Sequence, residues 1–202
     1  MTARWAVDVV QPKRDLEITW EPISLLYKNE PPEDSPYHAA SAFTHKLLRV
    51  LESVRAEAGD GPEASDAMRR LYWQYGAVLH HDRAAGTVDA AAVMGGDATP
   101  FLEAAGMDPA HNDAFGDEKW DAVIRERMDR GLDLVGTDVG TPIIAFDTPS
   151  GPKGVFGPVI SRMPPVEDAV ELWDAMVKMA TMDGFWELKR TRTEDPQFPE
   201  RP

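Results

Sequence analysis

The order of predicted elements indicates an α/β protein in which one strand and a later β-hairpin are separated by a large helical region. Three observations predict this order. Residues 16–20, LEITW, alternate as a strand does, and residues 37–134 carry apolar side chains at helical spacing. Residues 141–157 contain two short apolar runs joined by a turn rich in glycine and proline, which is typical of a hairpin.

The first half of the chain is expected to form a helix, a strand and two long helices. Residues 2–10, TARWAVDVV, should form a short helix that ends at QPKRD, because Pro12 disfavours helical geometry in the residue before it. After the strand LEITW, the proline-rich NEPPEDSP leads into two amphipathic helices separated by GDGP, where Pro62 suits a first helical turn. Their apolar faces are Phe43, Leu47, Val50, Leu51 and Val54, and then Met68, Leu71, Tyr72, Tyr75, Val78 and Leu79.

The second half is expected to close the fold with a hairpin and a helix. Shorter helical pieces between 87 and 114 precede another full helix marked by Trp120, Val123, Ile124 and Met128. The runs TPIIAF and VFGP flank the turn DTPSGPKG, and a last helix spans about 165–182. This order is most of a thioredoxin-like fold with an all-helical insertion, but its first β-strand is missing from the chain. The predicted divisions are 1–36, the insertion 37–134, then 135–184 and a tail 185–202.

Composition excludes several kinds of chemistry and partner. With 35 acidic and 21 basic residues the formal charge is −14, which argues against nucleic acid as a partner. No apolar run is long enough to cross a membrane and no leader-like segment is recognisable, so a cytoplasmic location without membrane contact is expected. The absence of cysteine excludes disulfides, thiolate zinc sites and thiol catalysis by these residues. The basic cluster Lys189, Arg190 and Arg192 is expected to be a solvated tail.

The segment VGTDVGTPIIAF raises the main functional question. Pro142, which follows Thr141, could simply mark the entry to a strand, where proline is tolerated. However, several stretches of the chain resemble the actinobacterial branch of the DsbA family. The strongest matches are GTDVGTPIIAF, FGPVISRMPP, ELWDAM and FWELKRTRTEDPQF, and TARW and ISLLYKNE give weaker support. This branch includes mycothiol-dependent nitroreductases, and the resemblance extends from about Thr2 to Phe198.

The resemblance implies a DsbA-type thioredoxin-like fold in which a cis Pro142 faces a redox cysteine. In that family a Cys-Pro motif directly precedes the segment resembling TARW. The chain is therefore expected to begin just after its own motif cysteine, and residues 1–202 alone should be poorly stable and inactive. The full-length form would be a thiol-disulfide oxidoreductase or a mycothiol-dependent reductase of disulfides or nitro compounds. It would use mycothiol as the electron donor and hold no bound cofactor.

The same resemblance implies substrate contacts at Thr141, Pro142, Asn29, Tyr37 and His80. Each has a simpler interpretation, since Asn29 could form a turn, Tyr37 could be a hydrophobic anchor and His80 could be exposed or capping. His80 and His81 point in different directions on a helix, so no metal site is expected.

Further alternatives concern other residues and the protein as a whole. Trp5 and Trp20 are expected in the core, and the acids of DEKWD and VEDAVE near helix starts. One alternative function is a non-catalytic thioredoxin-fold module that binds peptides or small ligands. Another alternative is an unrelated helical protein, in which residues 141–157 would not form a hairpin with Pro142 at its edge.

Overall fold

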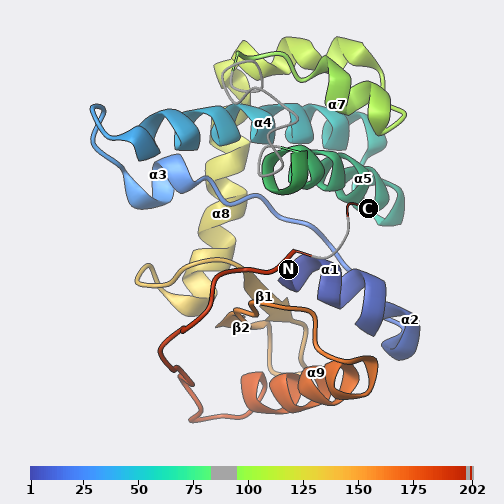
Figure 1. The fold of residues 1–202 in the computed structure, drawn as a ribbon, viewed down its shortest axis with the longest axis vertical. Coiled ribbons are helices and arrows are strands. Elements are labelled where there is room, and N and C mark those ends of the chain that lie inside the picture. Colours follow the sequence, from blue (N-terminus) through green and yellow to red (C-terminus); the bar gives the residue numbers. More distant parts are fainter. Residues whose placement is uncertain (83–94, 199–200, 202) are drawn as a thin grey trace. The chain divides into compact units, whose positions relative to one another are not determined.

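A computed structural model describes residues 1–82, 95–198 and 201 of the chain (Figure 1). Within these residues the protein is mixed α/β and mostly helical, with one antiparallel two-stranded sheet. The chain divides into two compact units. Unit 1 comprises Met1–Glu17 and Arg130–Glu200, and unit 2 comprises Ile18–Asp129 and Arg201–Pro202.

Unit 2 is built from helices around one apolar core. The two predicted amphipathic helices are confirmed as α4 (Pro36–Ala58) and α5 (Pro62–Ala77), and Pro62 lies in the first turn of α5. Their predicted apolar faces, apart from Tyr72, which is exposed, meet in a core centred on Leu47, Val50 and Leu71. The other elements are α3 (Leu25–Asn29), η2 (Val78–Asp82), α7 (Thr99–Ala104), η3 (Pro109–Gly116), η4 (Glu118–Trp120) and the first part of α8 (Asp121–Val135).

The predicted strand over Leu16–Trp20 is wrong, because this segment has no regular secondary structure. Its backbone is hydrogen-bonded by side chains of the helices instead. Ser65 donates to the carbonyl oxygen of Ile18, and Arg55 donates to that of Trp20. A strand-like sequence forms a strand only when a neighbouring strand supplies the hydrogen bonds. Here α4 and α5 satisfy the same carbonyl groups, and the half-buried Trp20 ring packs against Tyr72 and Trp73.

Unit 1 begins with helical turns that run on through Pro12. The successive elements are α1 (Thr2–Arg4), η1 (Trp5–Val10) and α2 (Gln11–Arg14), so the expected end of the helix before Pro12 is wrong. Pro12 lies in the first turn of α2, directly after the π-helical η1, where a missing N–H is tolerated. The helix ends at Asp15, which has the left-handed φ of 49°.

The predicted hairpin and closing helix are confirmed in unit 1. Strand β1 (Ile143–Phe146) pairs with β2 (Lys153–Phe156), with Ile143 opposite Phe156 and Phe146 opposite Lys153. Helix α9 (Val166–Ala180) packs its apolar face on the sheet side of the unit, and Glu167 and Asp168 lie in its first turn as expected. The core of unit 1 contains Trp5, Val10, Ala169, Trp173 and Met176.

Some predictions lie only partly within the described residues. The helical pieces expected between 87 and 114 are seen as α7 and η3, while the part of this range up to residue 94 lies outside the described residues. No helix in residues 1–82, 95–198 or 201 is both long and apolar enough to cross a bilayer.

Candidate functional site

Thr141 and Pro142 lie at the entry to β1, at an open edge of the hairpin. The Thr141–Pro142 peptide bond is cis, and the Pro142 carbonyl accepts a hydrogen bond from the Gly157 N–H at 2.8 Å. Thr141 is exposed, and its backbone N–H and C=O make no hydrogen bond to any described residue. An extended ligand could therefore pair with the Thr141 backbone, as a further strand pairs with a sheet edge.

The N-terminus of the first helix is tied to the same corner of unit 1. The Thr2 hydroxyl donates to the Pro158 carbonyl oxygen at 2.7 Å, and Pro158 directly follows Gly157. Trp5 is fully buried and donates its indole N–H to the Ala169 carbonyl oxygen at 3.0 Å, which fixes the helix on α9. Two hydrogen bonds thus link the Pro142 edge, through the Gly157–Pro158 dipeptide, to the start of a helix. Helix starts favour negative charge and lower the pKa of a thiol placed there.

Asn29, Tyr37 and His80 belong to unit 2. Asn29 is the exposed last residue of α3, and Tyr37 lies in the first turn of α4 with 76% of its surface exposed. The two flank a short loop, and His38 of α4 contacts the carbonyl oxygen of Pro31 in that loop at 3.1 Å through Nδ1. His80 is exposed and lies in η2, beyond the end of α5. Thr141 and Pro142 are thus in one unit, and these three residues are in the other.

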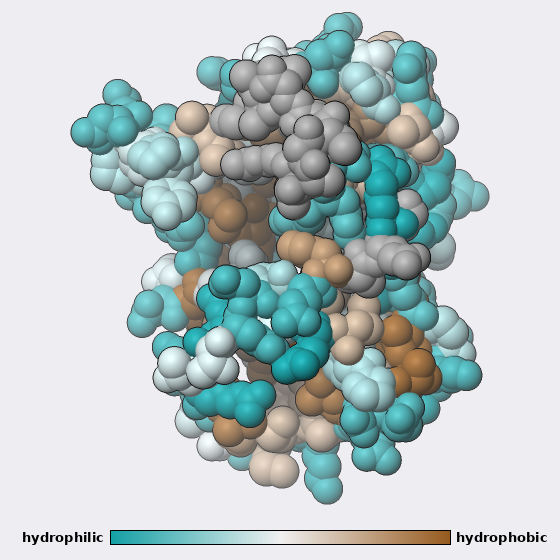
Figure 2. Space-filling view, viewed as in Figure 1, coloured by the Kyte–Doolittle hydropathy of each residue, from teal (hydrophilic) through white to brown (hydrophobic). Residues whose placement is uncertain are grey.

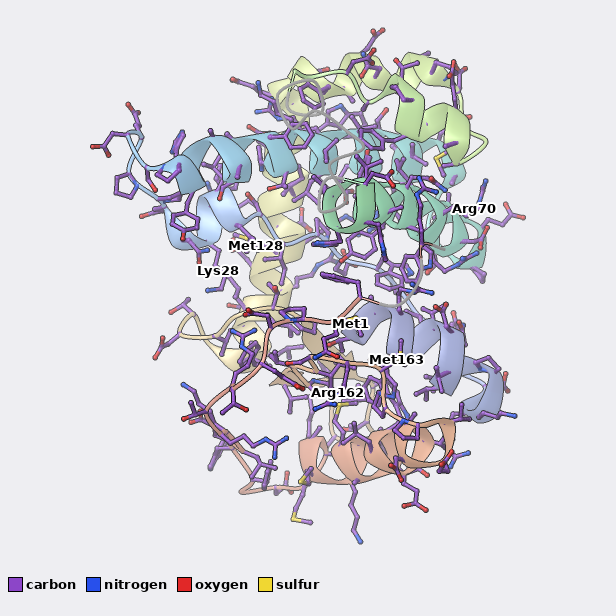
Figure 3. The ribbon with its side chains drawn as sticks, viewed as in Figure 1. Met1, Lys28, Arg70, Met128, Arg162 and Met163 are labelled. Carbon is purple, nitrogen blue, oxygen red and sulfur yellow. The ribbon has the colours of Figure 1, made fainter. Side chains whose placement is uncertain are left out.

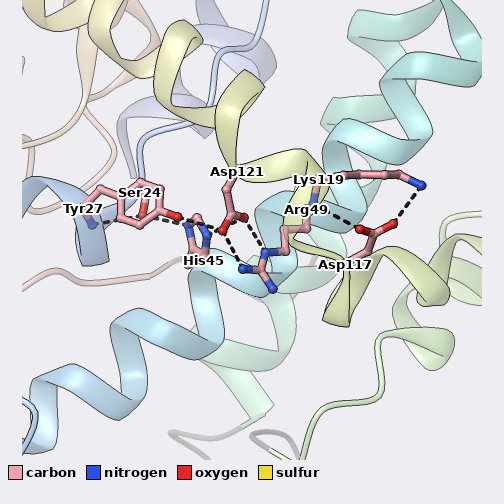
Figure 4. A network of polar contacts seen from close by, with 7 residues as sticks. All are labelled: Ser24, Tyr27, His45, Arg49, Asp117, Lys119 and Asp121. Atoms are coloured by element: carbon pink, nitrogen blue, oxygen red, sulfur yellow. Dashed lines mark hydrogen bonds and ion pairs between the residues drawn. The ribbon is translucent and has the colours of Figure 1, made fainter.

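A buried polar network in unit 2 is centred on Asp121 (Figure 4). Arg49 donates to both carboxylate oxygens, at 2.6 and 2.7 Å, and the Tyr27 hydroxyl donates at 2.9 Å. His45 Nε2 lies 3.0 Å from the same carboxylate, and its Nδ1 lies 2.9 Å from the Ser24 hydroxyl. Desolvation acts to raise the pKa of Asp121, but the hydrogen bonds from Arg49, Tyr27 and His45 prevail and lower it.

Ser24, His45 and Asp121 form a chain of contacts like that of a hydrolase triad, yet they are arranged as a structural tie. Ser24 is fully buried and His45 is 2% exposed, so no substrate carbonyl could reach the hydroxyl. The Ser24 oxygen also caps α3 by accepting from the Tyr27 N–H at 3.2 Å. Desolvation lowers the pKa of His45, which favours the neutral ring. The network therefore fixes α3, and with it Asn29, to α4 and α8.

Comparison with protein families places this chain. The family model described as mycothiol-dependent nitroreductase Rv2466c matches residues 1–190. The chain belongs to the Rv2466c-like family. This family of mycothiol-dependent nitroreductases agrees with the nitroreductase-like branch expected from the sequence.

In this Rv2466c-like chain, sequence reasoning missed the Asp121 network. The acids of DEKWD were expected only near a helix start, and Asp121 does begin α8. Its partners Tyr27, His45 and Arg49 lie 72 to 94 residues away along the chain. No local pattern reports such contacts. The one available signal was the placement of His45 and Arg49 four residues apart, a spacing that brings two side chains together on one helix face.

A second ionic cluster of the Rv2466c-like chain also lies in unit 2. Glu52 is 2% exposed and contacts Arg127 at 3.1 Å and Arg55 at 3.4 Å, and Arg127 further contacts Glu21. Burial raises the pKa of Glu52, so its charge depends on both arginines. The residues that the structure describes contain no group of three His, Asp, Glu or Cys side chains placed to hold a metal ion.

Proposed function

We propose that the protein takes part in thiol-dependent reduction of small disulfides or nitro compounds, with mycothiol as the electron donor. Family membership supports the reaction class and the donor. The observation that carries the proposal for this chain is the edge at Thr141 and Pro142, which is exposed, has an unpaired Thr141 backbone among the described residues, and is linked to a helix start. On this proposal unit 1 acts as a thioredoxin-like domain of DsbA type.

The proposed role of the edge is to hold a ligand sulfur or nitro group beside the start of the first helix. In thiol–disulfide exchange a thiolate attacks one sulfur of a disulfide and expels the other as a thiolate, so the reaction needs an ionised thiol. The positive end of the helix would stabilise that thiolate. None of the 202 residues is a cysteine, so the thiol in our proposal belongs to mycothiol or to a group other than these residues.

The remaining ligand contacts are assigned to unit 2. Asn29, Tyr37 and His80 stay proposed substrate contacts, as the resemblance implies. Tyr37 and His80 belong to the helical insertion, for which we keep the proposed bounds 37–134, and Asn29 belongs to the α3 segment before it. The tied position of α3 supports a role for Asn29, because the Asp121 network fixes the helix that carries it. The exposed ring of Tyr37 offers an amphipathic contact surface.

The proposal is tested by binding of mycothiol disulfide to the purified chain, measured by calorimetry. Thr141→Gly keeps the backbone N–H and should bind like the unchanged protein, whereas Thr141→Pro removes that donor. One lost hydrogen bond is worth about 0.5–1.5 kcal/mol, so binding should weaken by about 2- to 13-fold in the proline variant. Equal affinity of both variants and the unchanged chain, with the fold intact by circular dichroism, would remove the support for edge docking.

The absence of cysteine favours a second candidate, a non-catalytic binding module with the same edge. The two candidates differ in turnover by the protein as it exists in its native cell. Intact mass and N-terminal peptide analysis of the native protein, followed by a mycothiol-dependent turnover assay, separates them. Ligand binding with turnover at the uncatalysed rate would establish the binding module, and turnover above that rate would establish the reductase.

A further inference from the structure

The segment Trp186–Thr193, WELKRTRT, is an uncovered stretch in unit 1. All eight of its residues are exposed, and Trp186 and Leu188 are 90% and 78% exposed. The segment has no helix or strand, and its backbone makes no hydrogen bond to any other residue that the structure describes. A tryptophan normally buries most of its large apolar surface. A solvent-exposed indole ring close to a solvent-exposed leucine therefore indicates a contact surface.

This segment is held at both ends, although it is uncovered itself. Before it, Lys153 on β2 contacts Asp183 at 2.5 Å and the Thr181 carbonyl oxygen at 2.9 Å. After it, Arg162 forms a bidentate ion pair with Glu194 at 2.8 and 3.1 Å (Figure 3). The Gln197 N–H also donates to the Ser161 carbonyl oxygen. The segment is therefore presented from the body of unit 1 between two fixed points.

Charge indicates what kind of surface the segment would contact. It carries three basic residues and Glu187, a net charge of +2, so the rest of the chain carries −14 − 2 = −16. Hydrophilic residues, in teal, cover much of the face shown in Figure 2. The segment carries both signs of charge close together, because Glu187 lies two residues from Lys189, so it can pair through opposite charges with a second segment of the same sequence. An anionic bilayer would repel the remainder of the chain.

We propose that the protein self-associates through antiparallel pairing of Trp186–Arg190, within this segment, with the same residues of a second copy, centred on Leu188. Two-fold symmetry requires that when residue i faces residue j, j also faces i. In this register Leu188 faces its own symmetry mate, Glu187 faces Lys189, and Trp186 faces Arg190. The three pairs are apolar, ionic and cation–π contacts, all favourable across an antiparallel pair.

The unpaired backbone supplies the second component of the contact. Free N–H and C=O groups on an extended segment pair readily with another strand, and two such segments satisfy each other. The pairing involves far fewer than the roughly 20–30 residues that each partner gives to a standard interface. The dimer is therefore weak, and its fraction depends on protein concentration.

Charge exchange tests the register, with sedimentation velocity over a concentration series as the measurement. Glu187→Lys alone places lysine opposite lysine, and Lys189→Glu alone places glutamate opposite glutamate, so each variant should dimerise at least about tenfold more weakly. Mixing the two variants restores both ionic pairs in a heterodimer, and the double exchange restores them in a homodimer. A monomeric unchanged chain, or variants that dimerise as well as it does, would overturn the proposal, and so would a mixture that fails to recover.

Cross-linking tests the centre of symmetry, because the chain contains no cysteine of its own. Residues directly opposite in an antiparallel pair have Cα atoms about 4.5–5.5 Å apart, within the range that a disulfide spans. Under mild oxidation Leu188→Cys should form a covalent dimer, whereas Thr193→Cys should remain monomeric because its symmetry mate lies about 30 Å away along the strands. Equal cross-linking of both variants, or binding to acidic vesicles by a chain that stays monomeric, would overturn the pairing.

Discussion

Replacement of Asp121 by asparagine should destabilise unit 2 strongly. The carboxylate is the common acceptor for Arg49, Tyr27 and His45, and Arg49 is only 7% exposed. Asparagine keeps the shape of the side chain but removes the negative charge, so the buried guanidinium loses its counter-charge. Removing one partner of a buried ion pair costs about 3–5 kcal/mol, a large share of the roughly 5–15 kcal/mol that stabilises a domain.

The measurement is urea unfolding followed by tryptophan fluorescence and far-ultraviolet circular dichroism. With a slope of about 2 kcal/mol per molar urea, a loss of 3–5 kcal/mol lowers the midpoint by about 1.5–2.5 M. Asp174→Asn is the matched control, because its pair with Arg14 is exposed and the loss of that pair should leave the urea midpoint nearly unchanged.

A double-mutant cycle identifies the cause of that loss. Arg49→Met removes the buried charge, so adding it to Asp121→Asn should cost less than the sum of the two single effects. A free energy of unfolding for Asp121→Asn within about 0.5 kcal/mol of the unchanged protein, the range of an ordinary surface substitution, would refute the assigned role of the network.

Two further predictions concern pH and backbone packing. Burial lowers the pKa of His45 from 6.5, so the folded state resists protonation and the free energy of unfolding should fall as pH drops below 6.5. His45→Gln should lose this dependence when urea unfolding is compared at neutral and mildly acidic pH, and an unchanged slope would contradict the assignment. Gly154→Ala should destabilise unit 1 by about 1–3 kcal/mol, because the added Cβ would lie 2.8 Å from Cβ of Leu134 and 3.1 Å from Cγ1 of Val135. Gly131→Ala in α8 is the control, because the added Cβ meets nothing within 4 Å, and it should be neutral or stabilising by up to about 1 kcal/mol. Both variants are compared by thermal unfolding, and equal shifts of their melting temperatures would be inconsistent with this packing.

The elements that sequence predicted well are those specified by local patterns. Helices α4, α5 and α9 follow from apolar residues at helical spacing, and the hairpin follows from two β-favouring runs around a glycine- and proline-rich turn. Leu16–Trp20 shows where that approach ends. The alternation in this segment was real, but whether it forms a strand depends on Arg55 and Ser65, which lie far along the chain and satisfy its carbonyl groups.

The candidate site divides in the same way. Thr141 and Pro142 could be selected from sequence only through the resemblance of GTDVGTPIIAF to the DsbA family, because proline at the entry to an apolar run is otherwise ordinary. The unpaired Thr141 backbone could not be deduced in this way, since it depends on which groups approach in three dimensions. The Asp121 network was likewise hidden, because its members come from α3, α4 and α8 and share no sequence spacing.

The Asp121 network and the Thr141 edge differ in whether their hydrogen-bonding groups already have partners, and that difference decides which of them suits a ligand. Around Asp121 the residues with the most suggestive chemistry, Ser24 and His45, are buried and bonded to each other, so a ligand would have to break contacts to enter. At Thr141 the side chain offers no unusual chemistry, but the exposed backbone donor and acceptor have no protein partner among the described residues. A ligand gains hydrogen bonds there without displacing any that the described residues make to the Thr141 backbone. Binding is therefore expected at the plain edge of the hairpin and not at the triad-like cluster.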